Sequence, residues 1–139
     1  MRSDKENIIV EKTINFSLLV IKYSEVLEQD KKYVIAKQLL RSGTSIGANV
    51  FEAQNAESKA DFIHKMKVAA KEASETLYCL ILCERSGTYK FDMQMRTDID
   101  EIIRILSKII ASSKTGIRNF IWLLFLAFSN FQIIKFSNS

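Results

Sequence analysis

The chain contains no proline and only four glycines among its 139 residues. Proline breaks the interior of a helix, and proline and glycine together mark the many turns that sheet proteins need. Their scarcity therefore favours long helices joined by short links. Nearly half of the residues are apolar, so a chain of this length can form one core as a single domain.

Residues that carry catalytic or metal chemistry are also scarce. The chain has one histidine, His64, and two cysteines, Cys79 and Cys83. A di-iron bundle needs two Glu-x-x-His repeats, and a four-cysteine zinc site needs more ligands. The segment 43–47 lacks the Gly-Lys-Ser/Thr ending of a phosphate loop. The sequence predicts a non-enzymatic protein without metal or cofactor, with His64 on the surface and both cysteines in or near the core.

The charge balance excludes few partners. A net charge of +4 permits a nucleic acid or an anionic membrane as partner, and it equally fits an ordinary solvated surface. Residues 1–11 are too charged for a secretory signal. With two cysteines and no such signal, we expect a reducing, cytoplasmic setting.

Apolar residues recur at alternating steps of four and three in four segments, which is the spacing of helices packed on other helices. The segments cover about residues 4–29, 31–55, 59–86 and 91–114. The seam of the first segment is Ile9, Thr13, Phe16, Val20, Tyr23 and Leu27, and that of the second is Ala36, Leu40, Gly43, Gly47 and Val50, widened by Leu39, Ile46 and Ala53. The seam of the third segment is Phe62, Met66, Ala69, Ala73, Thr76, Leu80 and Cys83. The seam of the fourth is Met95, Ile99, Ile102, Leu106 and Ile109, broadened by Ile103 and Ile110. Short links between such segments predict an all-α, antiparallel up-down-up-down four-helix bundle over residues 1–116.

Several residues mark the expected helix ends. Asp30 is a candidate N-cap for the second helix, and Ser58, followed by Asp61, has the spacing of a capping box for the third. Gly87 and Gly116 are expected to follow the last turns of the third and fourth helices.

The second helix contains two internal glycines, each of which costs about 1 kcal/mol relative to alanine. Gly43 and Gly47 lie one turn apart, so they predict close approach of a neighbouring backbone. A loop over residues 42–45 is the alternative.

A polar face lies next to this glycine stripe on the second helix. Its members are Arg41, Ser45, Asn49 and Glu52. Glu72 and Glu75 on the third helix are candidate partners for Arg41. One interpretation is a buried polar network that fixes helix register. The other is a contact site for a subunit or for RNA.

Basic residues collect on the second and third helices. They are Lys37, Arg41, Lys59, Lys65, Lys67 and Lys71. Such rows contact phosphates and release counterions from RNA. Because acidic residues interrupt them, a solvated face is the alternative. A closed ring of subunits would repeat a weak patch and strengthen it.

The tail over residues 117–139 has a different composition. Between Arg118 and Lys135 lie 16 uncharged residues, which would extend about 24 Å as a helix. A bilayer core needs about 30 Å. The tail is therefore open to four interpretations: a short membrane anchor, an extra helix on the bundle, an oligomer contact, or an extension that packs poorly.

The motif residues resemble the signature of a known family. The segments 39–50, 56–67 and 71–76 are similar to the bacterial four helix bundle protein family, which includes proteins encoded in intervening sequences of 23S ribosomal RNA genes. The resemblance extends over about residues 11–114, and the tail departs from it. It implies a four-helix bundle, commonly a homopentamer. The matching motif positions are Arg41, Ser42, Ser45, Asn49 and Glu52, which the resemblance assigns to structure and assembly.

A relative of this family, the accessory variability protein of diversity-generating retroelements, is similarly a pentameric bundle and resembles a scaffold for a reverse transcriptase and its RNA. The resemblance therefore implies a non-catalytic, self-assembling protein that binds structured RNA or a ribonucleoprotein. The alternatives are a reverse-transcriptase accessory subunit, or a membrane-attached bundle held by the tail.

Overall fold

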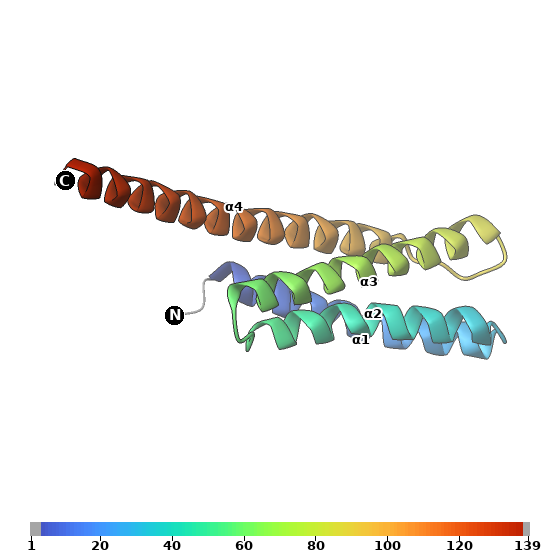
Figure 1. Ribbon diagram of the computed structural model, residues 1–139. Coiled ribbons are helices and arrows are strands. Elements are labelled where there is room, and N and C mark those ends of the chain that lie inside the picture. Colours follow the sequence, from blue (N-terminus) through green and yellow to red (C-terminus); the bar gives the residue numbers. More distant parts are fainter. Residues whose placement is uncertain (1–3, 138–139) are drawn as a thin grey trace.

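Four helices run alternately up and down in the computed structural model, which describes residues 4–137 and the side chains of residues 8–116 and 118–126 (Figure 1). They are α1 (Asp4–Gln29), α2 (Tyr33–Ala53), α3 (Lys59–Ser86) and α4 (Met93–Ser137). No strand occurs within residues 4–137. The predicted all-α bundle is confirmed, and the predicted bounds of α1 and α3 coincide with the observed ones.

The core lies along the predicted seams. All six seam residues of α1 are buried, as are those of α3 from Met66 to Cys83 and those of α4 from Met95 to Leu106. In α2 the seam is wrong at Leu40, which is 36% exposed. The buried stripe instead runs through Leu39 and Ile46, because α2 packs on one side against α1 and on the other against α3. Leu40 lies about 100° further round the helix.

The turn between α1 and α2 corrects the role of Asp30. The N–H groups of Lys31 and Lys32 donate to the carbonyls of Glu28 and Leu27 at 2.9 and 2.8 Å, and Lys31 has a left-handed φ of 61°. This is a Schellman ending of α1, in which Asp30 is the C-terminal cap residue. α2 therefore begins only at Tyr33, after Lys32, without a side-chain cap.

The ends of α3 are confirmed. Ser58 Oγ accepts from the Asp61 N–H at 3.0 Å, and the Asp61 carboxylate accepts from the Glu57 N–H at 3.2 Å. Gly87 ends the helix with a φ of 68°, a conformation that costs a glycine little. α4 begins two residues later than predicted, because the Asp92 carboxylate accepts from the backbone N–H of Gln94.

The predicted end of α4 at residues 114–116 is wrong. The helix continues through Gly116 to Ser137, although Ser113 is its last buried residue among those described. Gly116 does not adopt a positive φ, and nothing lies within 4 Å of the place where its Cβ would be. One glycine costs about 1 kcal/mol in a helix, which does not end it without a capping contact.

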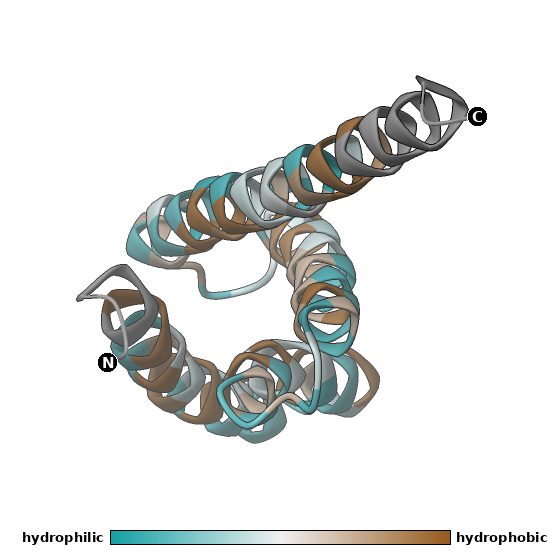
Figure 2. Ribbon diagram, turned by 60° about the vertical axis from the view of Figure 1, so that its left-hand side comes forward, coloured by the Kyte–Doolittle hydropathy of each residue, from teal (hydrophilic) through white to brown (hydrophobic). Residues whose placement is uncertain are grey.

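After Ser113, α4 leaves the other three helices, and residues 114–116 and 118–126 are exposed (Figure 2). No helix is long and apolar enough to cross a membrane within the part of the chain that the structure describes. The division into a bundle of residues 1–116 and a separate tail of residues 117–139 stays a prediction.

Candidate functional site

The two glycines of α2 bring it close to α1. A Cβ on Gly43 would lie 2.8 Å from both methyl groups of Val20, and a Cβ on Gly47 would lie 3.3 Å from Ser17 Oγ. α2 is an unbroken helix through residues 42–45, so the loop alternative is wrong. At Gly43 the close neighbour is the Val20 side chain, which leaves no room for alanine, whereas the predicted approach of a neighbouring backbone is found at Gly47, where a Cβ would lie 3.4 Å from the Thr13 carbonyl oxygen.

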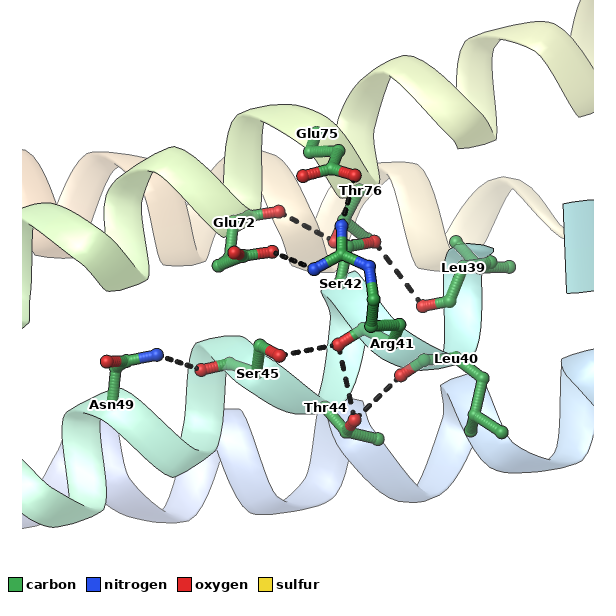
Figure 3. Close-up of polar contacts among 10 residues, drawn as sticks. All are labelled: Leu39, Leu40, Arg41, Ser42, Thr44, Ser45, Asn49, Glu72, Glu75 and Thr76. Atoms are coloured by element: carbon green, nitrogen blue, oxygen red, sulfur yellow. Dashed lines mark hydrogen bonds and ion pairs between the residues drawn. The ribbon is translucent and has the colours of Figure 1, made fainter. Parts of the chain in front are cut away.

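Arg41 links α2 to α3 (Figure 3). Its guanidinium lies 3.5 Å from the Glu72 carboxylate and hydrogen bonds to the Glu75 carboxylate. The hydrogen bond from Arg41 lowers the pKa of Glu75, and the same bond raises the pKa of Arg41. The predicted partners are therefore confirmed. The expected burial is wrong for Arg41, whose side chain is 54% exposed because it reaches across the outside of the α2–α3 groove.

The buried part of the α2–α3 contact is formed by Ser42 rather than Arg41. Ser42 and Thr76 are both fully buried, and their hydroxyl oxygens are hydrogen bonded at 2.9 Å. Ser45 Oγ donates to the Arg41 carbonyl at 2.7 Å, and the Asn49 amide donates to the Ser45 carbonyl at 2.8 Å. Ser45 and Asn49 therefore bond to the backbone of their own helix (Figure 3).

Glu52, the last motif residue, pairs with Lys65 on α3 at 3.3 Å, but its side chain is 62% exposed, so the expected burial is wrong for Glu52 as well. Three of the motif residues, Arg41, Ser42 and Glu52, thus join α2 to α3, while the interleaved glycines lie against α1. This arrangement fixes the register of three helices. It contains no nucleophile paired with a base.

The six candidate cations divide into two groups. Arg41 and Lys65 are paired with carboxylates across the α2–α3 groove. Lys37, Lys59, Lys67 and Lys71 are exposed, and the last two lie one turn apart on the outer face of α3. The sequence reasoning missed Tyr78, which is 60% exposed and lies two turns beyond Lys71 on the same face. Its seven-residue spacing from Lys71 was the available signal.

A second unpredicted feature is an apolar row on the outside of α1. Ile14, Leu18 and Ile21 are 41%, 55% and 39% exposed and follow one another at steps of four and three. The same step that reveals the buried seam marks this row on the opposite side of the helix. Among the described residues, Leu40 and Phe51 of α2 are also exposed, at 36% and 61%.

A small cleft lies between α1 and α4, which contact each other less than the other adjacent helix pairs do. It has a volume of about 190 Å³. Lys12 and Glu101 form an ion pair at 3.0 Å beside it, and Phe16 and Ile102 line its apolar side. Typical ligand sites measure about 300–1,000 Å³, so this cleft is too small for most cofactors.

The two cysteines lie in the core and the histidine lies on the surface, as the sequence predicted. Cys79 and Cys83 are fully buried and unbridged, and burial raises the pKa of both thiols, which opposes thiolate chemistry. His64 is exposed. Among the described residues, no group of three or more His, Cys, Asp or Glu side chains could hold a metal ion.

Comparison with known proteins identifies similar sequences and structures. Residues 5–108 match the family model of the 23S rRNA-intervening sequence protein. A crystal structure of a protein with unknown function from the S23 ribosomal protein family of Bacteroides thetaiotaomicron is 41% identical. The match covers 77% of this chain and 98% of that chain, with a TM-score of 0.71. No curated protein matches the chain. Residues 109–139 lie beyond the family model.

Proposed function

The chain belongs to the 23S rRNA-intervening sequence protein family, and we propose that it is a non-catalytic bundle that self-assembles and binds structured RNA. The observation that carries self-assembly is the apolar row Ile14, Leu18 and Ile21, which is exposed on the face of α1 that points away from the core. These three side chains do not belong to the buried core of a single chain. A ring of five copies is the assembly that the family resemblance implies.

The register of α1 and α2 extends the apolar row into a wider face. Gly43 lies against Val20 and Gly47 lies near Thr13. From this antiparallel register we infer that Leu40 lies at about the level of Ile21 and Phe51 at about the level of Ile14. Exposed apolar residues at matching levels of two neighbouring helices support a protein–protein contact, because burying them removes apolar surface from water.

The outer face of α3 supports RNA as the partner of the assembly. Lys67 and Lys71 present two ammonium groups one turn apart, and Tyr78 adds an exposed ring on the same face. Ammonium groups bind phosphates, and stacking on an aromatic ring contributes about 1–3 kcal/mol per base. A closed ring would repeat this weak face in every copy, so that several contacts act together.

Self-assembly is tested by the solution mass of the full chain. Leu18→Lys places a charge in the centre of the apolar row, so we expect it to dissociate the oligomer while leaving the helical circular dichroism unchanged. Asn15→Lys introduces the same side chain on the exposed side of α1 outside the row, and it should keep the wild-type mass. A monomeric wild-type chain would contradict self-assembly.

RNA binding is tested by the salt dependence of the affinity for a stem-loop RNA. Replacing Lys67 and Lys71 by glutamine should lower the slope of log K against log salt by about 2, one for each lost phosphate contact. The same change at Lys22 and Lys31, which are exposed elsewhere, should leave the slope unchanged. RNA binding that is absent at low salt, or insensitive to salt, would refute the RNA part of the proposal.

A further inference from the structure

Within the C-terminal half of α4, residues 120–126 present apolar side chains on every side of the helix. Residues 120–126 are seven consecutive large apolar residues, and each is between 43% and 63% exposed. Seven residues make nearly two turns of helix, so this segment has no polar face. A helix that is apolar all round is stable where apolar groups surround it, whereas a helix docked on one partner needs only a stripe.

The positive charge of the protein lies at this same end. Residues 102–139 contain five Lys or Arg residues and no Asp or Glu. Residues 1–101 contain 15 Lys or Arg residues and 16 Asp or Glu residues. Lys108, Lys114 and Arg118 precede the apolar segment at exposed positions, and Lys135 follows it in the sequence. A partner for this helix must therefore be apolar in its interior and anionic at its boundary.

We propose that this segment of α4 inserts into a bilayer that contains anionic phospholipid, with its basic end among the headgroups. Lipid meets both requirements, since acyl chains surround the apolar segment and headgroup phosphates face the cations. A second copy of the helix meets neither, because one neighbour covers one side only and brings Arg118 and Lys114 of like charge together.

The dimensions of the segment define how it embeds. The uncharged residues 119–134 would extend about 24 Å as a helix. This length is shorter than the hydrocarbon core of a bilayer, which is about 30 Å thick, but longer than the half of that core formed by one leaflet. Trp122 lies one turn after Arg118, and tryptophan favours the boundary between headgroups and acyl chains. The basic end of the segment therefore lies among headgroups. This binding is independent of the proposed RNA function.

Trp122 gives a direct test, because it is the only tryptophan in the chain and its side chain is 62% exposed. Its fluorescence is measured on the full chain with vesicles of equal parts phosphatidylcholine and phosphatidylglycerol, and with vesicles of phosphatidylcholine alone. We expect the emission to shift to shorter wavelength with the anionic vesicles, and lipids brominated on the acyl chains to quench it. An unshifted emission with anionic vesicles overturns the proposal.

A pair of matched variants tests the apolar part. Leu123→Glu with Leu124→Glu should abolish flotation of the full chain with anionic vesicles. Val34→Glu with Leu82→Glu makes the same change at exposed apolar residues of α2 and α3, and it should leave flotation unchanged. If the tail pair instead lowers the solution mass and vesicles never bind, the helix has a second copy as its partner and the proposal is wrong.

A second pair tests the charge complementarity. Each cation near an anionic surface strengthens binding about fivefold. Changing Lys108, Lys114 and Arg118 to glutamine should therefore weaken partitioning into the anionic vesicles by about 100-fold. The same substitution at Lys22, Lys31 and Arg85 removes equal charge from exposed positions elsewhere and should have little effect. Equal losses from both sets would show that net charge alone attracts the chain, and would overturn the assignment to this helix.

Discussion

Gly43 is the position where the structure makes its sharpest prediction about stability. Substitution by alanine normally stabilises a helix, by about 1 kcal/mol relative to glycine. At Gly43, however, the new Cβ would lie 2.8 Å from both Cγ atoms of Val20. Carbon atoms in contact lie about 3.5–4.0 Å apart, so each methyl group is about 1 Å too close. We therefore expect Gly43→Ala to destabilise the bundle.

The magnitude depends on whether Val20 can move. Val20 is fully buried, and a β-branched side chain in a helix has one strongly preferred rotamer, so relief requires α1 and α2 to separate. Overpacking of this kind costs about 1–3 kcal/mol. After the gain in helix propensity of about 1 kcal/mol, the net loss of unfolding free energy is up to about 2 kcal/mol, or up to roughly 8 °C in Tm.

Urea unfolding followed by circular dichroism measures this loss, and the other glycines of the helices provide matched controls. A Cβ on Gly47 meets its nearest atom at 3.3 Å, and a Cβ on Gly116 meets none within 4 Å. Gly47→Ala should thus be close to neutral, and Gly116→Ala should not destabilise. In the double variant Val20→Ala with Gly43→Ala, the two losses should be less than additive by about 0.5–3 kcal/mol. A Gly43→Ala chain that is more stable than the wild type by the full helix-propensity gain of about 1 kcal/mol would refute the close-approach reasoning.

Three further predictions concern a cap, a carboxylate and the thiols. Ser58→Ala removes the hydrogen bond to the Asp61 N–H and should cost about 1 kcal/mol in urea unfolding, whereas Ser58→Asp should retain the cap. Because folding lowers the pKa of Glu75 below its usual 4.5, its contribution to stability is present above that pH and is lost as the pH falls through the lower folded value. Glu75→Gln should flatten the decline of stability in this acidic range. Cys79 and Cys83, buried with raised pKa, should react with iodoacetamide at the rate of unfolding rather than at the rate of free thiols.

The sequence was sufficient for the fold because one physical pattern dominates it. The steps of four and three identify the buried faces of α1, α3 and α4, and Ser58 and Gly87 mark helix ends through chemistry that is local in sequence. The prediction for Asp30 was wrong because a residue between two helices can cap the C-terminus of the first helix as well as the N-terminus of the second. Lys31 closes α1 in the left-handed conformation. Lysine has no preference for that conformation, so the sequence did not reveal it.

The sequence predicted which residues of the candidate site pair with each other, but not which of them are buried. The spacing of Arg41 from the seam correctly paired it with Glu72 and Glu75. Spacing alone does not state how far a long side chain reaches, and the Arg41 guanidinium extends outward over the groove. The buried polar contact is made by the shorter Ser42, whose hydroxyl stays between the helices beside Thr76.

The motif that identifies the family is therefore a description of the fold rather than of the partner. Its glycines contact α1, and its polar residues contact α3 or their own backbone. Apart from the exposed Arg41 and Glu52, three outward surfaces lie outside the motif: the apolar row of α1, the lysines and Tyr78 of α3, and residues 120–126 of α4. Packing within the chain constrains none of these three surfaces, so they can change while the bundle stays the same. We propose that these three surfaces, rather than the motif, decide what the protein binds. Variants at Leu18, at Lys67 with Lys71, and at Leu123 with Leu124 test the three surfaces separately without disturbing the joint of α1, α2 and α3.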